Sequence, residues 1–209
     1  MSARRERLQA ARLYLVCGGQ RPDLDSFLDL ALASGVDVLQ LREKQMEARP
    51  LLALAEHFRA ACDRHGALFV INDRPDLAIA AGADGVHVGQ DDLPPGVARD
   101  LVGDEMLIGR STHAPAQMRA ALAEPVDYLC VGPVHATPTK PGRPATGLDS
   151  VRLAAAECAK PWFAIGGLDP QTAKEAANAG ARRIVVVRAI EQAADVEGAV
   201  RALRSAIGA

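Results

Sequence analysis

Short apolar runs alternate along the chain with longer segments in which apolar residues recur at helical spacing. Each run is a nearly continuous series of Val, Ile, Leu and Ala, which is typical of parallel strands covered on both faces. The runs predict eight strands, at residues 13–17, 36–41, 68–72, 85–88, 106–109, 128–132, 162–165 and 184–187.

Amphipathic segments that follow these strands predict helices at residues 24–33, 50–64, 76–81, 95–102, 115–123, 149–159, 170–179 and 196–207. Several begin with Pro or Asp, which suits the first helical turn. Gly35, Gly66, Gly82 and Gly180 follow helices where a left-handed residue is favoured. Unbroken β/α alternation favours a single (β/α)8 TIM barrel over residues 1–209, with a short N-terminal helical extension.

Composition narrows the classes of function. Hydrophobic residues make up 49% and charged residues 24% of the chain, the balance of a globular protein. A net charge of -2 argues against a general polyanion binder, because affinity for a phosphate backbone needs clustered Lys and Arg. The N-terminal residues lack the apolar core of a signal peptide, and no stretch reaches the ~20 apolar residues of a membrane span. We therefore expect a cytoplasmic protein.

Polar residues follow the second predicted strand, at the end of the barrel where active sites of this fold lie. The segment reads Gln40, Leu41, Arg42, Glu43 and Lys44. Strand alternation places Gln40, Arg42 and Lys44 on one face, and three such donors suit a phosphorylated ligand. The alternative is a solvated cluster of charges at the surface.

Carboxylates follow the next two strands. Asp73 comes after the third strand, beside Asn72, and Asp92 comes after the fourth. Mg²⁺ favours a few carboxylate oxygens together with water and substrate phosphate, so the pair predicts a Mg²⁺ site completed by a diphosphate. The alternative is that both Asp residues cap the helices that follow them.

The remaining strand ends add hydroxyl, cationic and glycine positions. Ser111 and His113 follow the fifth strand, where His113 is either a general base or a residue at the start of a helix. A long Pro-, Thr- and Gly-rich segment over residues 135–147 follows the sixth strand and predicts a loop that captures phosphate or closes over a substrate. Gly167, Val187 and Arg188 follow the last two strands, a common phosphate site in this fold. These groups together predict two anion sites on one rim.

The ordered motifs resemble the thiamine phosphate synthase family. They lie at residues 40–44 (QLREK), 71–74 (INDR), 85–93 (GVHVGQDDL), 111–113 (STH), 137–140 (TPTK) and 164–167 (AIGG). The resemblance extends over nearly the whole chain, and its specificity comes from six motifs in register. One departure is Arg188, where the family often has Ser.

The resemblance implies an enzyme that uses one Mg²⁺ ion per subunit to join a pyrimidine diphosphate to a thiazole phosphate. It implies that Asp73 and Asp92 bind the metal. It implies catalytic roles for Arg42, Lys44, Ser111 and Lys140. The implied substrate-binding residues are Gln40, Leu41, Arg42, Glu43, Lys44, Asn72, Ser111, Thr137, Pro138, Thr139, Lys140, Gly167, Val187 and Arg188.

Two alternatives remain open from the sequence. A thiazole tautomerase of the same superfamily would use a His near the sixth strand, such as His135, and would not need the diphosphate and Mg²⁺ residues. A barrel that binds a thiamine-related phosphate without catalysis would be expected to lose the carboxylates or Lys140. Partners are expected to be small molecules rather than nucleic acid or membrane, and a small homo-oligomer is compatible with the sequence.

Overall fold

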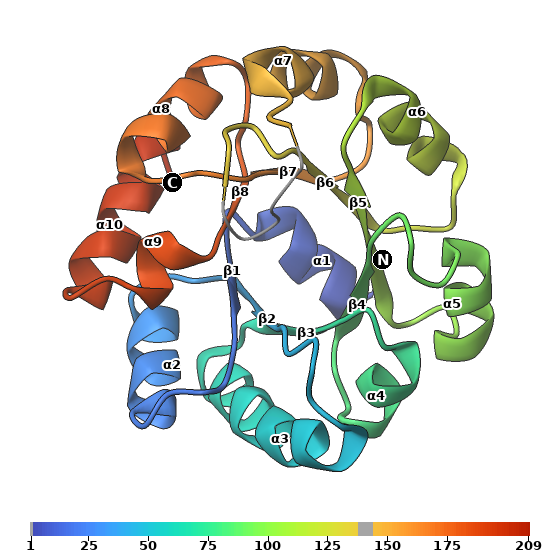
Figure 1. Ribbon diagram of the computed structural model, residues 1–209, viewed down its shortest axis with the longest axis vertical. Helices are drawn as coiled ribbons and strands as arrows, with labels where there is room; N and C mark the ends of the chain where they lie inside the picture. The colour runs from blue at the N-terminus through green and yellow to red at the C-terminus, as the bar shows by residue number, and fades with distance from the viewer. Residues whose placement is uncertain (1, 138–143) are drawn as a thin grey trace.

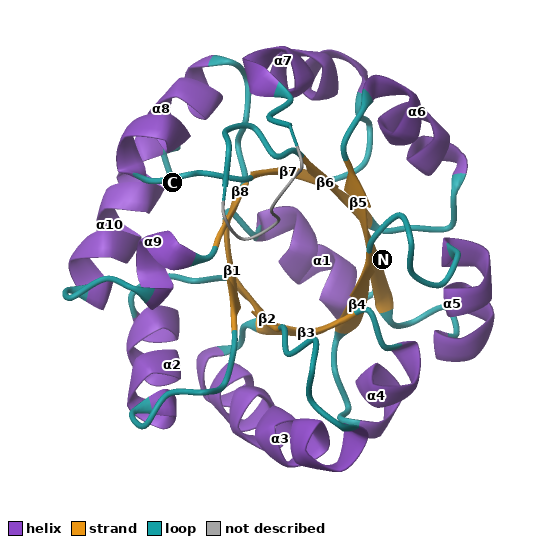
Figure 2. Cartoon of the chain, viewed as in Figure 1, coloured by secondary structure: helices purple, strands orange, loops and turns teal. Residues whose placement is uncertain are grey.

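Eight parallel strands close into a barrel in chain order (Figures 1 and 2). The computed structural model describes residues 2–137 and 144–209. The strands are β1 (Leu13–Cys17), β2 (Val38–Leu41), β3 (Leu68–Asn72), β4 (Gly85–Val88), β5 (Leu107–Thr112), β6 (Tyr128–Val131), β7 (Trp162–Ile165) and β8 (Ile184–Val186). Pairing of β8 with β1 closes the ring, so the predicted TIM barrel is confirmed.

Helices surround the strands, as Figure 2 shows. They are α1 (Ala3–Ala10), α2 (Leu24–Ala33), α3 (Ala48–His65), α4 (Pro75–Ala80), α5 (Pro95–Val102), α6 (Pro115–Ala123), α7 (Gly147–Glu157), α8 (Pro170–Asn178), α9 (Arg188–Glu191) and α10 (Val196–Ala206). Gly66 ends α3 in the left-handed region, at φ 66°, as its position after an amphipathic run predicts.

One predicted boundary and one missed helix differ from the structure in an informative way. The sequence ends the fifth strand at Gly109, whereas β5 continues through Arg110, Ser111 and Thr112, which are polar but buried. A pattern that marks strands by apolar residues stops where the strand begins to carry polar groups into the site. The short helix α9 was not predicted, because its four residues are too few to show a period.

Strand residues alternate between two apolar layers. Side chains such as Leu39 and Leu41 pack outward against the helices, whereas Tyr14, Tyr128 and Phe163 fill the barrel interior. Gly109 is needed in this interior, because a Cβ there would lie 2.2 Å from Cζ of Tyr128. The barrel interior is therefore a packed core toward the N-terminal ends of the strands, and open space is confined to their C-terminal ends.

Helix α1 lies across the barrel opening at the N-terminal ends of the strands (Figure 1). Leu8 of this helix is buried within the interior layer. The guanidinium groups of Arg4 and Arg7 each lie 3.1 Å from Oδ1 of Asp84. The predicted N-terminal helical extension thus closes the end of the barrel opposite the predicted site.

Three aspartates repeat one arrangement at this closed end. Asp37, Asp84 and Asp127 each directly precede a strand, and each carboxylate accepts a hydrogen bond from a backbone N–H of the previous strand. The N···O distances are 2.9 Å from Leu13, 3.0 Å from Phe69 and 2.8 Å from Ile108. An arginine pairs with each carboxylate, so these charges are compensated where they leave water.

In residues 2–137 and 144–209, no helix combines the length and the apolar character needed to cross a membrane.

The Asp84 carboxylate should contribute strongly to stability. We expect Asp84→Asn to lower the free energy of unfolding at pH 7 by about 2 kcal/mol, because the charged hydrogen bonds from Phe69 N–H and Arg59 are lost. Urea denaturation measures the difference. As a control, Asp149→Asn removes only a solvent-exposed pair with Arg152 and should change stability by less than about 0.5 kcal/mol.

The pH dependence of this difference has a defined sign. Burial alone would raise the pKa of Asp84, but the Phe69 N–H and the Arg59 guanidinium outweigh it and the pKa is lowered. The stabilisation is thus present above the unfolded-state pKa of about 3.9 and is lost as pH falls through the lower folded-state pKa. A gap between wild type and Asp84→Asn that grows in acid would contradict this account.

Candidate active site

Two cavities open at the C-terminal ends of the strands. The first has a volume of about 250 Å³, and its lining includes Gln40, Arg42, Lys44, Asn72, Asp73, Asp92 and Ser111. The second has a volume of about 340 Å³, and its lining includes Ser111, Thr137, Gly167, Val187 and Arg188. The predicted basic and acidic groups therefore gather around one cavity, and the predicted glycine and hydroxyl positions around the other.

The two cavities adjoin. Ser111, His113, Ile165, Val185 and Val187 line both of them. These residues come from β5, β7 and β8 and from the positions that directly follow β5 and β8. Ligands in the two cavities would therefore meet at a shared boundary that is lined partly by apolar side chains.

The strand period decides which residues of the segment after β2 face the first cavity. Gln40, Arg42 and Lys44 line it, as alternation predicts. Leu41 packs outward in the layer beneath the helices, and Oε1 of Glu43 accepts a hydrogen bond from the Gly19 N–H at 2.8 Å. The side chains of Leu41 and Glu43 thus point away from the cavity, and their contact with a substrate, which the resemblance implies, stays a prediction.

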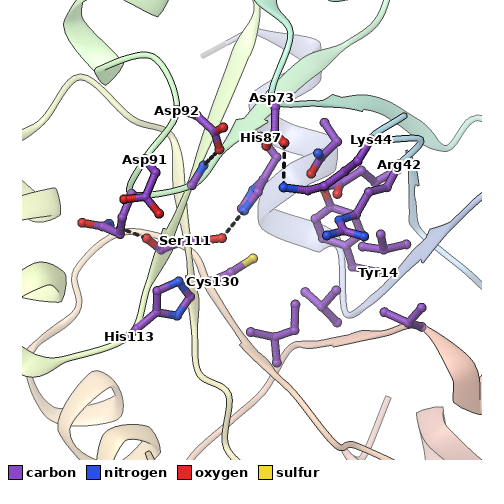
Figure 3. A pocket seen from close by; sticks show the side chains of 18 residues that line it. Tyr14, Arg42, Lys44, Asp73, His87, Asp91, Asp92, Ser111, His113 and Cys130 are labelled. Carbon is purple, nitrogen blue, oxygen red and sulfur yellow. Dashed lines mark hydrogen bonds and ion pairs between the residues drawn. The ribbon is translucent and has the colours of Figure 1, made fainter. Parts of the chain in front are cut away.

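The carboxylates of Asp73 and Asp92 come together at the edge of this cavity (Figure 3). Nζ of Lys44 lies 3.3 Å from Oδ2 of Asp73, and Oδ2 of Asp92 accepts a hydrogen bond from the Gly89 N–H at 2.7 Å. Burial raises the pKa of Asp73, and the Asp92 carboxylate raises it further, while Lys44 lowers it. The pair is thus a concentration of negative charge that Lys44 only partly offsets.

Helix capping does not explain these two aspartates. The N-cap residues of α4 and α5 are Arg74 and Pro94, and neither helix has a side-chain cap. Asp73 has a positive φ of 62°, and its N–H donates to the His87 carbonyl at 2.8 Å, which ties the β3 end to β4. Such a backbone conformation in a non-glycine residue is uncommon and is typical of functional sites.

The donor set fits a hard divalent cation. Within residues 2–137 and 144–209, no three His, Cys, Asp or Glu side chains group as a metal cage. Mg²⁺ is usually held by one or two carboxylates, with water and substrate phosphate completing the shell. Asp73 and Asp92 supply two such carboxylates and leave the other positions to a ligand.

Ser111 and His113 occupy the boundary between the cavities. Oγ of Ser111 lies 2.9 Å from Nε2 of His87, while Nδ1 of His113 lies 2.5 Å from the Gly132 carbonyl oxygen. The His113 N–H donates to Oε1 of Gln117, just before helix α6 begins. His113 therefore sits at a helix start and lines both cavities, so the two interpretations of this residue are compatible.

The second cavity is bounded by backbone that only glycine allows. Gly167 has φ 65°, and a Cβ there would lie 2.7 Å from the His135 Cβ. The turn after β7 thus packs closely against the segment after β6. Thr137 and Arg188 line the same cavity. Pro138, Thr139 and Lys140, which the resemblance places in substrate binding, lie outside the described residues.

Sequence reasoning gave no role to several residues that build the site. Tyr14 and His87 line the first cavity, and Tyr128 lies directly beneath, hydrogen-bonded to both. His87 stands within a recognised motif, but its function could not be inferred from spacing. The signal available for the tyrosines was their inward parity on β1 and β6, where a hydroxyl among apolar residues needs a polar partner.

Comparisons with known proteins identify the family of this chain. The family model for thiamine monophosphate synthase matches residues 13–190. A thiamine-phosphate synthase of Acidothermus cellulolyticus is 57% identical over 192 residues, which cover 90% of this chain and 91% of the relative. A thiamine-phosphate synthase of Mycolicibacterium smegmatis is 54% identical, with 98% and 95% covered.

A solved structure gives the same result. The thiamine phosphate pyrophosphorylase from Pyrococcus furiosus matches with a TM-score of 0.87 and 29% identity, over 98% of this chain and 97% of that one. The fold and the motif-based resemblance are therefore both confirmed. Since the family model and these relatives extend over most of the sequence, the chain belongs to the thiamine monophosphate synthase family.

Proposed function

We propose that the two adjoining cavities bind a pyrimidine diphosphate and a thiazole phosphate and join them with the help of Mg²⁺. As a member of its family, the chain is a transferase of thiamine biosynthesis that forms thiamine phosphate. The substrates are 4-amino-5-hydroxymethyl-2-methylpyrimidine diphosphate and 4-methyl-5-(2-hydroxyethyl)thiazole phosphate, or its 2-carboxy form. The observation that carries the proposal is that a charged cavity and a largely apolar one adjoin and share lining residues.

The first cavity suits the diphosphate. Arg42 and Lys44 offer cationic donors, and Gln40 and Asn72 offer amides to the same space. Asp73 and Asp92 would hold Mg²⁺, which when bound supplies positive charge to the leaving diphosphate. Lys140 is proposed to add a further cation there, on the basis of the family motif.

The second cavity suits the thiazole phosphate. Gly167 lets the backbone approach an anion closely, and Arg188 contributes a cationic side chain to the lining. Thr137 and Thr139 are proposed to donate hydroxyl hydrogen bonds to the same phosphate. Apolar residues such as Leu168 and Val186 line the rest and suit the thiazole ring.

With the plain thiazole phosphate the reaction needs one bond to break and one to form; with the 2-carboxy form the bond to the carboxylate must also break, and carbon dioxide leaves. The bond between the pyrimidine methylene carbon and the diphosphate oxygen breaks, and its electron pair leaves with pyrophosphate. The electron-rich aminopyrimidine carries the resulting positive charge. The lone pair of the thiazole nitrogen then forms a bond to the same carbon. Arg42 and Lys44 stabilise the departing charge, and the shared boundary of the two cavities lets both rings lie within reach of each other.

The tautomerase alternative is disfavoured because His135 lines neither of the two cavities. Its Nε2 lies 4.0 Å from Oε2 of Glu175 on α8, while the carboxylate pair and the cations of the first cavity are intact. A tautomerase would not need these carboxylates and cations. We further propose that the enzyme acts in the cytoplasm as one catalytic domain, and that it forms a small homo-oligomer.

The first test is the stoichiometry of products. We expect purified protein with both phosphorylated heterocycles and Mg²⁺ to release one pyrophosphate per thiamine phosphate formed. Chromatography and a coupled pyrophosphate assay measure the two. Isomerisation of a thiazole without pyrophosphate would support the tautomerase, and binding of both ligands by calorimetry without turnover would support a non-catalytic barrel.

The second test concerns the carboxylates. We expect Asp73→Asn and Asp92→Asn each to lower kcat/KM by about 100-fold or more and to raise the Mg²⁺ concentration needed for half-maximal rate. Asp76→Asn, in the first turn of α4 and in a solvent-exposed pair with Arg74, is the matched control and should stay within about twofold of wild type. An Asp73 variant with wild-type Mg²⁺ dependence would rule out the metal role.

The third test concerns the phosphate end of the second cavity. We expect Arg188→Ala to raise KM for the thiazole phosphate about tenfold and to leave KM for the pyrimidine diphosphate unchanged, because a charged hydrogen bond is lost from one cavity only. Arg182→Ala, an exposed arginine before β8, is the control. An unchanged KM would show that the backbone N–H groups hold the phosphate without this side chain.

A further inference from the structure

A chain of hydrogen bonds crosses the interior of the barrel and ends at the first cavity on both sides. It runs from Nε2 of Gln40 to the Tyr14 hydroxyl at 2.6 Å, and from there to the Tyr128 hydroxyl at 3.0 Å. It continues from Tyr128 to Nδ1 of His87 at 3.2 Å, and from Nε2 of His87 to Oγ of Ser111 at 2.9 Å. The five residues come from five different strands.

All five side chains are buried, with at most 6% of their surface exposed. Gly109 makes the central contact possible, because a Cβ there would lie 2.2 Å from the Tyr128 ring and 2.4 Å from Nδ1 of His87. Tyr128 lies below the residues that line the first cavity, so its hydroxyl serves the interior rather than a ligand. The interior is therefore shaped to hold this chain of polar groups within an otherwise apolar layer.

The direction of donation is linked from one end to the other. A phenol has one proton to donate, and a neutral imidazole has one donor and one acceptor nitrogen. Burial raises the pKa of both tyrosines, so each keeps its proton. If Gln40 donates to Tyr14, each group passes the direction on, and His87 donates to Ser111. The Ser111 hydroxyl is then a donor toward the cavity, and the Gln40 carbonyl is an acceptor.

Reversal of the chain exchanges both ends at once. Ser111 then donates to His87, and Tyr14 donates to the Gln40 carbonyl, so the cavity meets a Gln40 amide donor and a Ser111 acceptor. In either direction one end donates and the other accepts. With Nε2 of Gln40 facing Tyr14, a ring with an amino donor and ring-nitrogen acceptors fits in one orientation, and the opposite orientation would require every bond of the chain to reverse.

We propose that Tyr14, Tyr128 and His87 are positioning residues that couple Gln40 to Ser111, and that this coupling orients the aminopyrimidine ring in the first cavity. The proposal rests on the function proposed above. It assigns specificity for the ring to groups beneath the cavity floor, in addition to those that touch the ligand.

The test removes one hydroxyl from the middle of the chain. We expect Tyr128→Phe to lower kcat/KM for the pyrimidine diphosphate about tenfold, with KM for the thiazole phosphate unchanged. Phe163→Leu is the matched control. The centroid of the Phe163 ring lies 5.5 Å from that of Tyr14 and 5.7 Å from that of Tyr128, but a phenyl ring makes no hydrogen bond to either hydroxyl group through a polar atom. This variant should alter the urea midpoint while kcat/KM stays within about twofold.

A double-mutant cycle separates coupling from a merely structural role. In the wild-type background the effects of Gln40→Ala and Ser111→Ala on kcat/KM should be non-additive by fivefold or more. In the Tyr128→Phe background they should become additive, because the connection is broken. The nitrogen chemical shifts of His87 should also report one fixed tautomer in wild type and a mixture of tautomers in Tyr128→Phe.

The outcomes distinguish this inference from the proposed function. If wild type turns over, but the two end mutations are additive in both backgrounds and the His87 tautomer is unaffected by Tyr128→Phe, the coupling is wrong and the function stands. If wild type releases no pyrophosphate, the proposed function fails. A loss in Phe163→Leu equal to that in Tyr128→Phe would assign the effect to packing and overturn the inference.

Discussion

Repulsion between the carboxylates of Asp73 and Asp92 is the constraint around which the C-terminal end of the barrel is arranged. Lys44 and the Gly89 N–H each offset part of that charge, and Asp73 takes an uncommon backbone conformation to reach its place. The backbone bond between Asp73 and His87 fixes the third strand end to the fourth. A site that keeps such a pair without full compensation is prepared for a ligand that brings positive charge.

The packed interior explains how two cavities of different chemistry can adjoin. Alternation along each strand directs one set of side chains into the barrel, and near the C-terminal ends that set changes from apolar to polar. Ile165 and Val185 make the shared lining of the two cavities apolar, while Ser111 adds a hydroxyl to it. Such a lining lets two rings approach each other while little water competes for a reactive carbon.

The sequence allowed the strands, most helices and the residues on one face of the β2 end to be predicted, because these follow from short-range periodicity. Strand parity also directs Leu41 and Glu43 away from the cavity, and only membership of a family motif placed them among the substrate contacts. The continuation of β5 through Ser111 was missed because polar residues interrupt an apolar pattern. The Tyr14–Tyr128 bond joins residues 114 positions apart, and no local pattern encodes a contact of that range.

The aspartates before β2, β4 and β6 each accept a hydrogen bond from the previous strand and so connect neighbouring strands at the end where α1 closes the barrel. These hydrogen bonds make the barrel rigid at the end farthest from the candidate active site. The loops at the C-terminal ends of the strands can therefore vary in length and composition without weakening the pairing of the barrel strands. A lineage, or a protein engineer, can thus exchange those loops for new chemistry on an inherited scaffold.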